Sequence, residues 1–202
     1  DDDHLGVGVS SPKATLHIVG DDGILASGAV GTGQLMNPGA GVRMHWYSRR
    51  AAFRAGIVNG TQWDDANVGS FSVATGDGTI ASGRASVAMG YETTASAEGA
   101  IALGGETRAT GSHAMAVGQK TLASGVFSTA MGWLTIASGH TSTAIGHTTK
   151  AEGFRSFACG LESFAEGHDA VAMGIRTHAV GSASTVMGSN TVASGSRALA
   201  TG

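Results

Sequence analysis

Residues 72–85 read SVATGDGTIASGRA, and this 14-residue pattern continues to Gly202 without an insertion or a deletion. The repeated stretch holds nine full units and five further residues. With few exceptions, alanine occupies the third and tenth positions of the unit, glycine the fifth and twelfth, and threonine the eighth. A fixed period held over so many units is typical of a protein built from stacked repeats.

The composition of the unit favours strands over helices. Fourteen residues are too few for two helices and a turn, and each glycine inside a helix would cost about 1 kcal/mol. We predict two short strands per unit, such as 72–75 and 79–82, with turns at Gly76 and Gly83, where positive backbone angles carry no penalty. Stacked units would form an all-β solenoid, a parallel β-roll whose strands lie about 4.8 Å apart along a rod roughly 45 Å long.

Alternation along the strands predicts which side chains point inward. The first, third and fifth positions are small, and so are the eighth, tenth and twelfth. A flattened coil has room for little else, so we expect these columns inside it. The hydroxyl column that begins at Thr79 and ends at Thr191 would then form an internal hydrogen-bonding ladder.

The second and fourth positions are mostly apolar and alternate with the small ones, so we expect them on the outer face of the first strand. They would expose a continuous apolar stripe along the rod, and stripes of that size normally mark an interface. Closed symmetry would bury the stripe around an axis, in a dimer or a trimer. The candidate interface residues are Val73, Val87, Met89, Ile101, Leu103, Met115, Val117, Met131, Ile145, Cys159, Val171, Met173 and Met187.

Large residues at the turns are candidates for a receptor-binding strip. Tyr91, Trp133 and His147 share the sixth position of the unit, and Phe154 lies at a turn nearby. Such residues either pack on a neighbouring chain or form an exposed aromatic surface. A regular frame with variable outer residues is how solenoids build binding surfaces.

Residues 1–71 lack the repeat and are predicted to form a separate region ahead of the roll at 72–202. Two short strands are expected at 5–9 and 14–19, and a β-hairpin over 42–57 that turns at 48–50. The open end of a stacked sheet must be covered. The hairpin region is therefore predicted to cap the roll, with Trp46, Phe53 and Trp63 as its bulk.

The same hairpin carries several arginines and aromatic residues that could instead bind a receptor at the tip. Guanidinium groups grip carboxylates in pairs, and aromatic faces stack on apolar surfaces such as those of sugars. The candidate residues of this patch are Arg43, Trp46, Tyr47, Arg49, Arg50 and Arg54.

Several kinds of chemistry find no support in the sequence. The net charge is −3 with no basic stripe, so no nucleic-acid partner is expected. Neither a phosphate-binding loop nor a recurrent carboxylate pair is present, so we expect neither an enzyme nor a cofactor. His140 and His168 lie two coils apart, about 10 Å, which is too far for one metal ion. Membrane insertion is not expected, and the start at Asp1-Asp2-Asp3 suggests a piece of a longer chain.

The run Ser86-Val87-Ala88-Met89-Gly90, with Ala95 in step, resembles the head repeats of YadA-type trimeric adhesins. The resemblance covers residues 72–202. It implies a left-handed parallel β-roll, a homotrimer, and an extracellular role in which the head attaches a bacterial cell surface to a glycan or protein receptor. It carries over no binding residue, because the pattern describes a frame.

The start of the chain is similar to segments that open bacterial surface and phage tail-fibre modules. This similarity rests on residues 6–12, 14–19, 41–47 and 51–56. It keeps open the alternative of a receptor-binding tail fibre of a phage or a contractile injection system. A further alternative is a structural spacer within a surface fibre.

Overall fold

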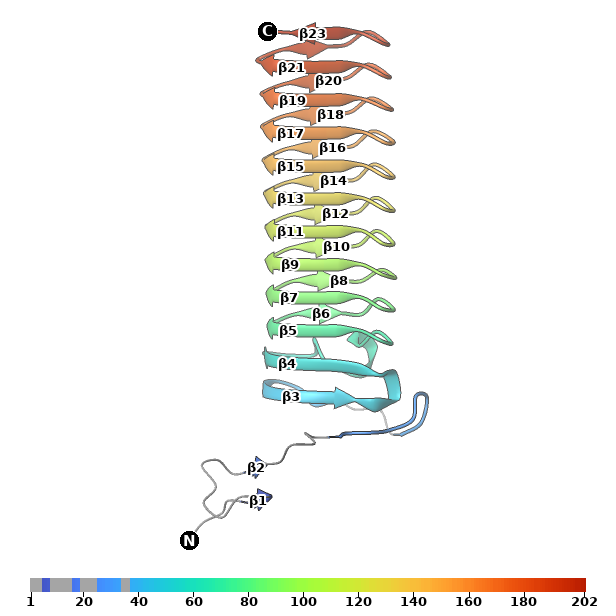
Figure 1. Ribbon diagram of the computed structural model, residues 1–202, viewed down its shortest axis with the longest axis vertical. Coiled ribbons are helices and arrows are strands. Elements are labelled where there is room, and N and C mark those ends of the chain that lie inside the picture. Colours follow the sequence, from blue (N-terminus) through green and yellow to red (C-terminus); the bar gives the residue numbers. More distant parts are fainter. Residues whose placement is uncertain (1–4, 8–15, 19–24, 34–36) are drawn as a thin grey trace.

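The computed structural model describes residues 5–7, 16–18, 25–33 and 37–202. Figure 1 shows the repeats as one column of stacked coils, with a hairpin at the N-terminal end of the column. Each complete coil consists of one longer and one shorter strand. Apart from two short 3-10 turns, the regular structure of the described residues is all β, which confirms the predicted parallel β-solenoid.

One strand of every coil joins a twelve-stranded sheet, which ends on the hairpin strands β4 and β3. Its coil strands are β5 (Val73–Asp77), β7 (Val87–Tyr91), β9 (Ile101–Gly105), β11 (Met115–Gln119), β13 (Thr129–Trp133), β15 (Thr143–His147), β17 (Phe157–Leu161), β19 (Val171–Ile175), β21 (Thr185–Ser189) and β23 (Leu199–Thr201).

The other strand of each coil has two residues and belongs to a nine-stranded sheet. Its members are β6 (Ile80–Ala81), β8 (Thr94–Ala95), β10 (Arg108–Ala109), β12 (Leu122–Ala123), β14 (Ile136–Ala137), β16 (Lys150–Ala151), β18 (Phe164–Ala165), β20 (His178–Ala179) and β22 (Val192–Ala193).

Neighbouring coils pair in parallel with a shift of one repeat. Met115 lies opposite Thr129, and Gly118 lies opposite Gly132. In the shorter sheet Arg108 lies opposite Leu122. Because the repeat has no insertions, each column of the sequence becomes a straight row of side chains along the rod.

The interior of the roll is made of alanine. The alanines of the third and tenth positions are almost completely buried except for Ala200 in the last, partial coil, and Val186 takes the place of one of them. Larger side chains would push the two facing strands apart, because interiors are close-packed. The predicted inward orientation of these columns is therefore confirmed.

The threonine column is buried as predicted, but the predicted hydrogen-bonding ladder is wrong for most of it. The Oγ1 atoms of six of these threonines, from Thr79 to Thr149, are buried without a hydrogen-bond partner among the described residues. One step of a ladder exists, where Thr177 donates to the Oγ of Ser163 at 2.9 Å, and Ser163 donates to the carbonyl of Gly174. Coils about 4.8 Å apart place identical hydroxyls beyond hydrogen-bond distance.

The prediction of turns with positive φ at Gly76 and Gly83 is only partly right, because Gly76 has φ of +118° but lies within β5, and Gly83 has no positive φ. The positive φ values at the tight turns belong to the seventh and fourteenth positions, which are mostly not glycine. Lys120 and Leu134 at position seven have φ of 55° and 52°, and Phe127 at position fourteen has φ of 57°. No sequence pattern indicates these φ angles, because the seventh and fourteenth positions carry residues of many types.

The two glycine columns have separate physical reasons. Gly104 at the fifth position has φ of +121°, and a Cβ there would lie 1.9 Å from the carbonyl oxygen of Gly118. Gly111 at the twelfth position has no such φ, but its Cβ would lie 2.0 Å from the oxygen of Gly125. Both columns favour glycine because the backbone of the next coil is close to the Cβ position, and Ala97 at the twelfth position is the exception in the sequence.

Two short strands, β1 (Leu5–Val7) and β2 (Leu16–Ile18), form a separate parallel pair. They lie within the two expected strand segments at 5–9 and 14–19. Residues 8–15, between the two strands, lie outside the described residues.

The predicted hairpin is present ahead of the roll. β3 (Gly41–Tyr47) and β4 (Ala52–Val58) pair antiparallel across the 3-10 turn η1 (Ser48–Arg50). β4 then pairs in parallel with β5, so the hairpin extends the twelve-stranded sheet by two strands. A second 3-10 turn, η2 (Asp65–Asn67), lies between β4 and the first coil.

Three hydrogen-bond donors of this region take the place of the backbone donors that a preceding coil would supply. They are the indole of Trp63, the backbone N–H of Gly69 and the guanidinium of Arg54. Within the roll, carbonyls at the eighth position accept from a backbone N–H of the preceding coil, as Thr93 does from Ile80 at 2.8 Å. At the first coil, the indole Nε1 of Trp63 donates to the carbonyl of Thr79 at 3.0 Å.

The carbonyl of Ala81 in the first coil is satisfied in the same way. The corresponding carbonyl in the next coil, that of Ala95, accepts from Ser82 and Gly83. The carbonyl of Ala81 accepts instead from the backbone of Gly69 at 2.8 Å and from Nη2 of Arg54 at 3.0 Å. The hairpin region thus caps the roll by satisfying its terminal hydrogen bonds.

Candidate functional site

The outer face of the twelve-stranded sheet carries the two apolar columns of the repeat. Side chains of the fourth position are substantially exposed in the single chain, for example Met89 at 43% and Met173 at 38%. Those of the second position are half-buried in most coils, for example Val87 and Val171. The thirteen candidate interface residues therefore lie on one continuous face, and their role in an interface stays a prediction.

This apolar face continues onto the hairpin, which the sequence did not indicate. Trp46 lies opposite Phe53, and Phe53 lies opposite Val73 of the first coil. Alternation places Val42 and Met44 on the same face as Trp46, and these two are 77% and 78% exposed. Trp46 thus extends the apolar stripe to the end of the sheet.

The six candidate residues of the hairpin patch do not form one surface. Tyr47 and Arg54 are buried, so neither is exposed to a receptor. Arg43 and Trp46 differ by an odd number of residues along β3 and therefore point to opposite faces. Arg43 donates to the carbonyl of Gly39 at 3.0 Å, and Arg49 donates to that of Gly33 at 3.1 Å.

A polar cluster joins the hairpin to the 3-10 turn η2. The carboxylate of Asp65 accepts two hydrogen bonds from the guanidinium of Arg50, at 2.8 and 3.1 Å, and one from the hydroxyl of Tyr47. The Arg50 hydrogen bond is the largest cause that holds the pKa of Asp65 below its usual value. Arg50 thereby has a structural role in the cap.

Arg54 is a buried cation that pairs with backbone groups. Its guanidinium donates to the carbonyls of Phe53, Ser72 and Ala81 and to the Oγ of Ser72, at 2.8 to 3.1 Å. Burial lowers the pKa of Arg54 to about 10, because desolvation disfavours its charged form. Arg54 therefore joins the hairpin to the first coil through the carbonyls of Ser72 and Ala81.

The large residues of the sixth position lie at the end of the longer strands. Trp133 and His147 occupy neighbouring coils, and their rings stack with centroids 4.4 Å apart. Tyr91 is exposed at the same position of β7, four coils further toward the N-terminus than His147. These three residues share one row, as predicted, and their binding role stays a prediction.

A second row of rings runs along the opposite turns of the coils. Phe127 stacks on His113 with centroids 5.3 Å apart and contacts the edge of His140 at 6.0 Å. Phe154 stacks on His140 at 5.3 Å and lies 6.0 Å from His168. Phe154 is therefore held within an imidazole–phenyl row and does not lie beside Trp133.

Charged turn residues pair with opposite charges one coil away. In each pair the two residues occupy the same position of neighbouring repeats. The pairs are Arg84 with Glu98, Lys120 with Glu106, Arg155 with Asp169 and Arg176 with Glu162. Each pair bridges two coils at the surface, where an ion pair contributes about 0–1 kcal/mol.

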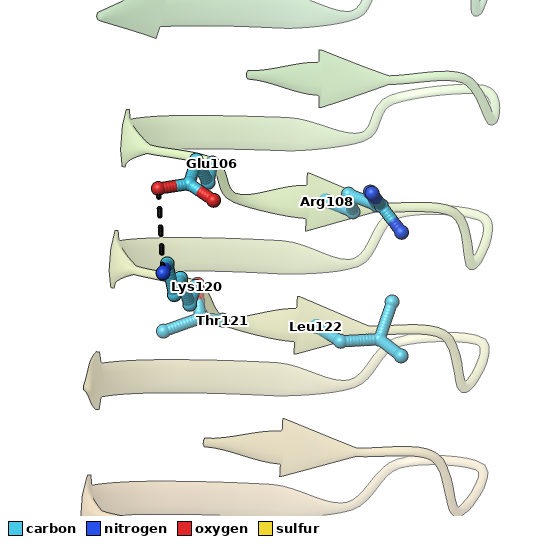
Figure 2. A pocket seen from close by; sticks show the side chains of 5 residues that line it. All are labelled: Glu106, Arg108, Lys120, Thr121 and Leu122. Atoms are coloured by element: carbon cyan, nitrogen blue, oxygen red, sulfur yellow. Dashed lines mark ion pairs between the residues drawn. The ribbon is translucent and has the colours of Figure 1, made fainter. Parts of the chain in front are cut away.

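A shallow hollow of about 200 Å³ lies on the side of the nine-stranded sheet (Figure 2). Its lining residues are Glu106, Arg108, Lys120, Thr121 and Leu122. Figure 2 shows Glu106 and Lys120 at the turn, and Arg108 and Leu122 extending from the neighbouring strands β10 and β12. The hollow thus combines two cations, one carboxylate and one apolar side chain.

Two further kinds of site are absent from the described residues. No group of three or more His, Cys, Asp or Glu side chains among them is arranged to hold a metal ion. The described part of the chain also contains no helix that is long and apolar enough to cross a membrane.

The family model of the YadA head domain repeat matches the chain at residues 81–107, 109–135, 137–163, 165–191 and 179–202. These matches cover more than half of the chain, and each falls within the stacked coils. The chain therefore belongs to the YadA head-repeat family, a structural and adhesive family. No curated protein matches the chain.

Proposed function

We propose that this chain forms the homotrimeric adhesive head of a bacterial surface fibre. The observation that carries the proposal is the apolar face of the twelve-stranded sheet, which runs from Trp46 on the hairpin to the last coil. Monomeric proteins rarely expose apolar patches of more than a few hundred Å². A second and a third copy of the same face around one axis would bury it.

The head would attach through several weak contacts at once. Three copies of each surface feature, on a stiff rod outside the cell, convert weak single contacts into strong avidity. The partner would be a glycan or a protein on a host or other cell surface. Membership of the YadA head-repeat family supports this proposal, and the rows of varied side chains at the turns supply the contact surface.

The oligomeric state is tested by light scattering of the 202-residue chain. The chain mass is 20.0 kDa, so three copies would give a mass of about 60 kDa. A mass near 20 kDa that does not change with concentration would contradict the proposal, because the apolar face would then be stable in water.

Attachment is tested with beads that carry the purified chain at one density. We expect the beads to bind cultured epithelial cells, and beads coated with albumin to remain unbound. Binding to bacterial envelopes instead would favour a tail fibre of a phage or a contractile injection system. The similarity of the N-terminal region to phage tail-fibre modules supports this alternative. Binding to neither surface would favour a spacer that carries its binding part elsewhere.

A further inference from the structure

We propose that the hollow between β10 and β12 binds a sugar that carries a carboxylate. The inference deepens the proposed function, on which it rests, because it names the ligand class of one surface of the head. That surface is the nine-stranded side, which remains free for ligands if the apolar face of the other sheet lies at the trimer axis.

Arg108 is a cation without an acidic partner among the described residues. Three other arginines of the roll, Arg84, Arg155 and Arg176, pair with an acidic side chain one coil away. Arg108 instead lies between Thr94 and Leu122 in its row, and its side chain makes no hydrogen bond or ion pair with the described residues. An exposed guanidinium at the edge of a hollow is suited to bind a carboxylate through two parallel hydrogen bonds.

Lys120 supplies a second cation that is only weakly engaged. Its Nζ lies 3.7 Å from Oε1 of Glu106 (Figure 2), which is longer than a hydrogen bond. Both side chains are roughly half exposed. Lys120 can therefore turn toward a ligand without the loss of a strong bond.

Glu106 and Leu122 make the hollow fit a sugar better than a simple anion. The carboxylate of Glu106 accepts hydrogen bonds, which ring hydroxyls can donate. Leu122 offers an apolar surface for the C–H face of a ring. With one carboxylate beside two cations, the hollow has a net charge of +1, which matches a single acidic group.

The size of the hollow sets the extent of the ligand. About 200 Å³ is smaller than the roughly 300–1,000 Å³ that drug-sized ligands occupy. The hollow would therefore hold one sugar ring, while the rest of an oligosaccharide would extend across the protein surface. Contact with a single ring predicts weak binding at each site, which three copies on a trimer would strengthen.

The test measures binding of the full 202-residue chain to defined oligosaccharides, by saturation-transfer NMR and by titration. The probes are a glucuronate disaccharide and sialyllactose, each with its neutral counterpart, a glucose disaccharide and lactose. We expect millimolar binding of at least one acidic probe and at least tenfold weaker binding of its neutral counterpart. The two acidic probes distinguish a uronic acid from a sialic acid as the source of the carboxylate.

Variants assign the binding to the hollow. Arg108→Ala is expected to weaken binding at least tenfold, and Lys120→Gln about threefold, with unchanged thermal unfolding. Lys150→Ala is the matched control. Lys150 occupies the same row as Arg108, three coils away, and lies over the ring of Phe164. It should bind as the unchanged chain does.

Several results would overturn the inference. These are equal binding of acidic and neutral sugars, unchanged binding by Arg108→Ala, equal binding of a short aspartate peptide, or no binding at 50 mM probe. They are separable from failure of the adhesive-head proposal. If the chain has the mass of a trimer and attaches beads to cells but does not bind acidic sugars, only the proposed sugar site is refuted.

Discussion

At the residue scale, the glycines of the fifth position show how closely the coils approach. Gly104 combines a φ of +121° with a Cβ position 1.9 Å from the oxygen of Gly118. Its neighbour Gly105 has no positive φ, and a Cβ there would meet Cγ of Gln119 at 3.7 Å, an ordinary contact. Gly105 can therefore accept a Cβ, whereas its neighbour Gly104 cannot do so without strain.

Gly104→Ala is expected to destabilise the roll by about 3 kcal/mol or more, because the φ angle and the backbone contact both oppose a Cβ. For a chain of this size that corresponds to a fall of roughly 6–12 °C in Tm. Gly105→Ala is the control and should stay close to the unchanged chain. Thermal unfolding followed by circular dichroism, at one protein concentration, measures both. Equal Tm values for the two variants would contradict the close approach of the coils.

At the element scale, the hairpin and the segment that follows it act as a substitute coil. The backbone N–H of Phe53 and the side chains of Arg54 and Trp63 reach the carbonyls of the first coil that a preceding coil would otherwise pair. A buried carbonyl that loses its donor costs about 1–3 kcal/mol. The cap therefore contributes to stability through specific hydrogen bonds as well as by covering apolar surface.

Trp63→Phe keeps most of the ring but removes the donor to the carbonyl of Thr79. We expect a loss of about 1–3 kcal/mol in the free energy of unfolding, since that carbonyl is left buried and unpaired. Trp133→Phe is the control, because Trp133 is exposed at the end of β13 and lies outside the cap. Urea denaturation measures both variants. A similar small effect of the two substitutions would show that the indole hydrogen bond is unimportant.

The cluster of Tyr47, Arg50 and Asp65 predicts how the cap responds to acid. Its hydrogen bond with Arg50 holds the pKa of Asp65 below its usual value. The stability that this carboxylate contributes is therefore complete above its unfolded pKa of about 3.9 and is lost as pH falls through the lower folded value. Unfolding of the cap, followed by tryptophan fluorescence, should become easier below about pH 4.

Asp65→Asn removes the titrating group and is the comparison for this prediction. The variant should be less stable than the unchanged chain at pH 7, and the difference should shrink as the pH falls below 4. A constant difference between the two chains from pH 7 to pH 2 would refute the role of Asp65.

At the scale of the whole molecule, the two sheets present different outer faces. The twelve-stranded sheet carries the apolar columns, while the nine-stranded sheet has a mixed row in which Arg108, Lys150 and His178 are interspersed among mostly apolar residues. This asymmetry favours one buried and one free face in an assembly.

A pair of matched substitutions tests which face lies at the interface. Met173→Asp places a charge on the apolar face, and Val180→Asp places one beyond the end of β20, where the side chain is similarly exposed. We expect Met173→Asp to lower the mass measured by light scattering toward that of one chain, because a buried unpaired charge is costly. Val180→Asp should leave the mass unchanged. The opposite pattern would reverse the assignment of the faces.

The sequence by itself determined the fold of the roll. An unbroken 14-residue period forces every coil into the same register, so the columns, the alanine interior and the outer apolar rows could all be read from spacing. The hairpin was also predictable, because alternation and a polar turn are local signals. These features depend on residues near one another in the chain.

Only the tertiary structure decided the functions of individual side chains. Arg54 and Trp63 serve as donors to the first coil, which no local pattern indicates, and Trp46 belongs to the apolar face. The hollow at Arg108 exists because residues one repeat apart lie side by side, so that an unpaired cation in one coil meets Lys120 and Leu122 of the next. Contacts of this kind depend on rotamers and on the exact approach of the backbone, which a repeat pattern leaves unspecified.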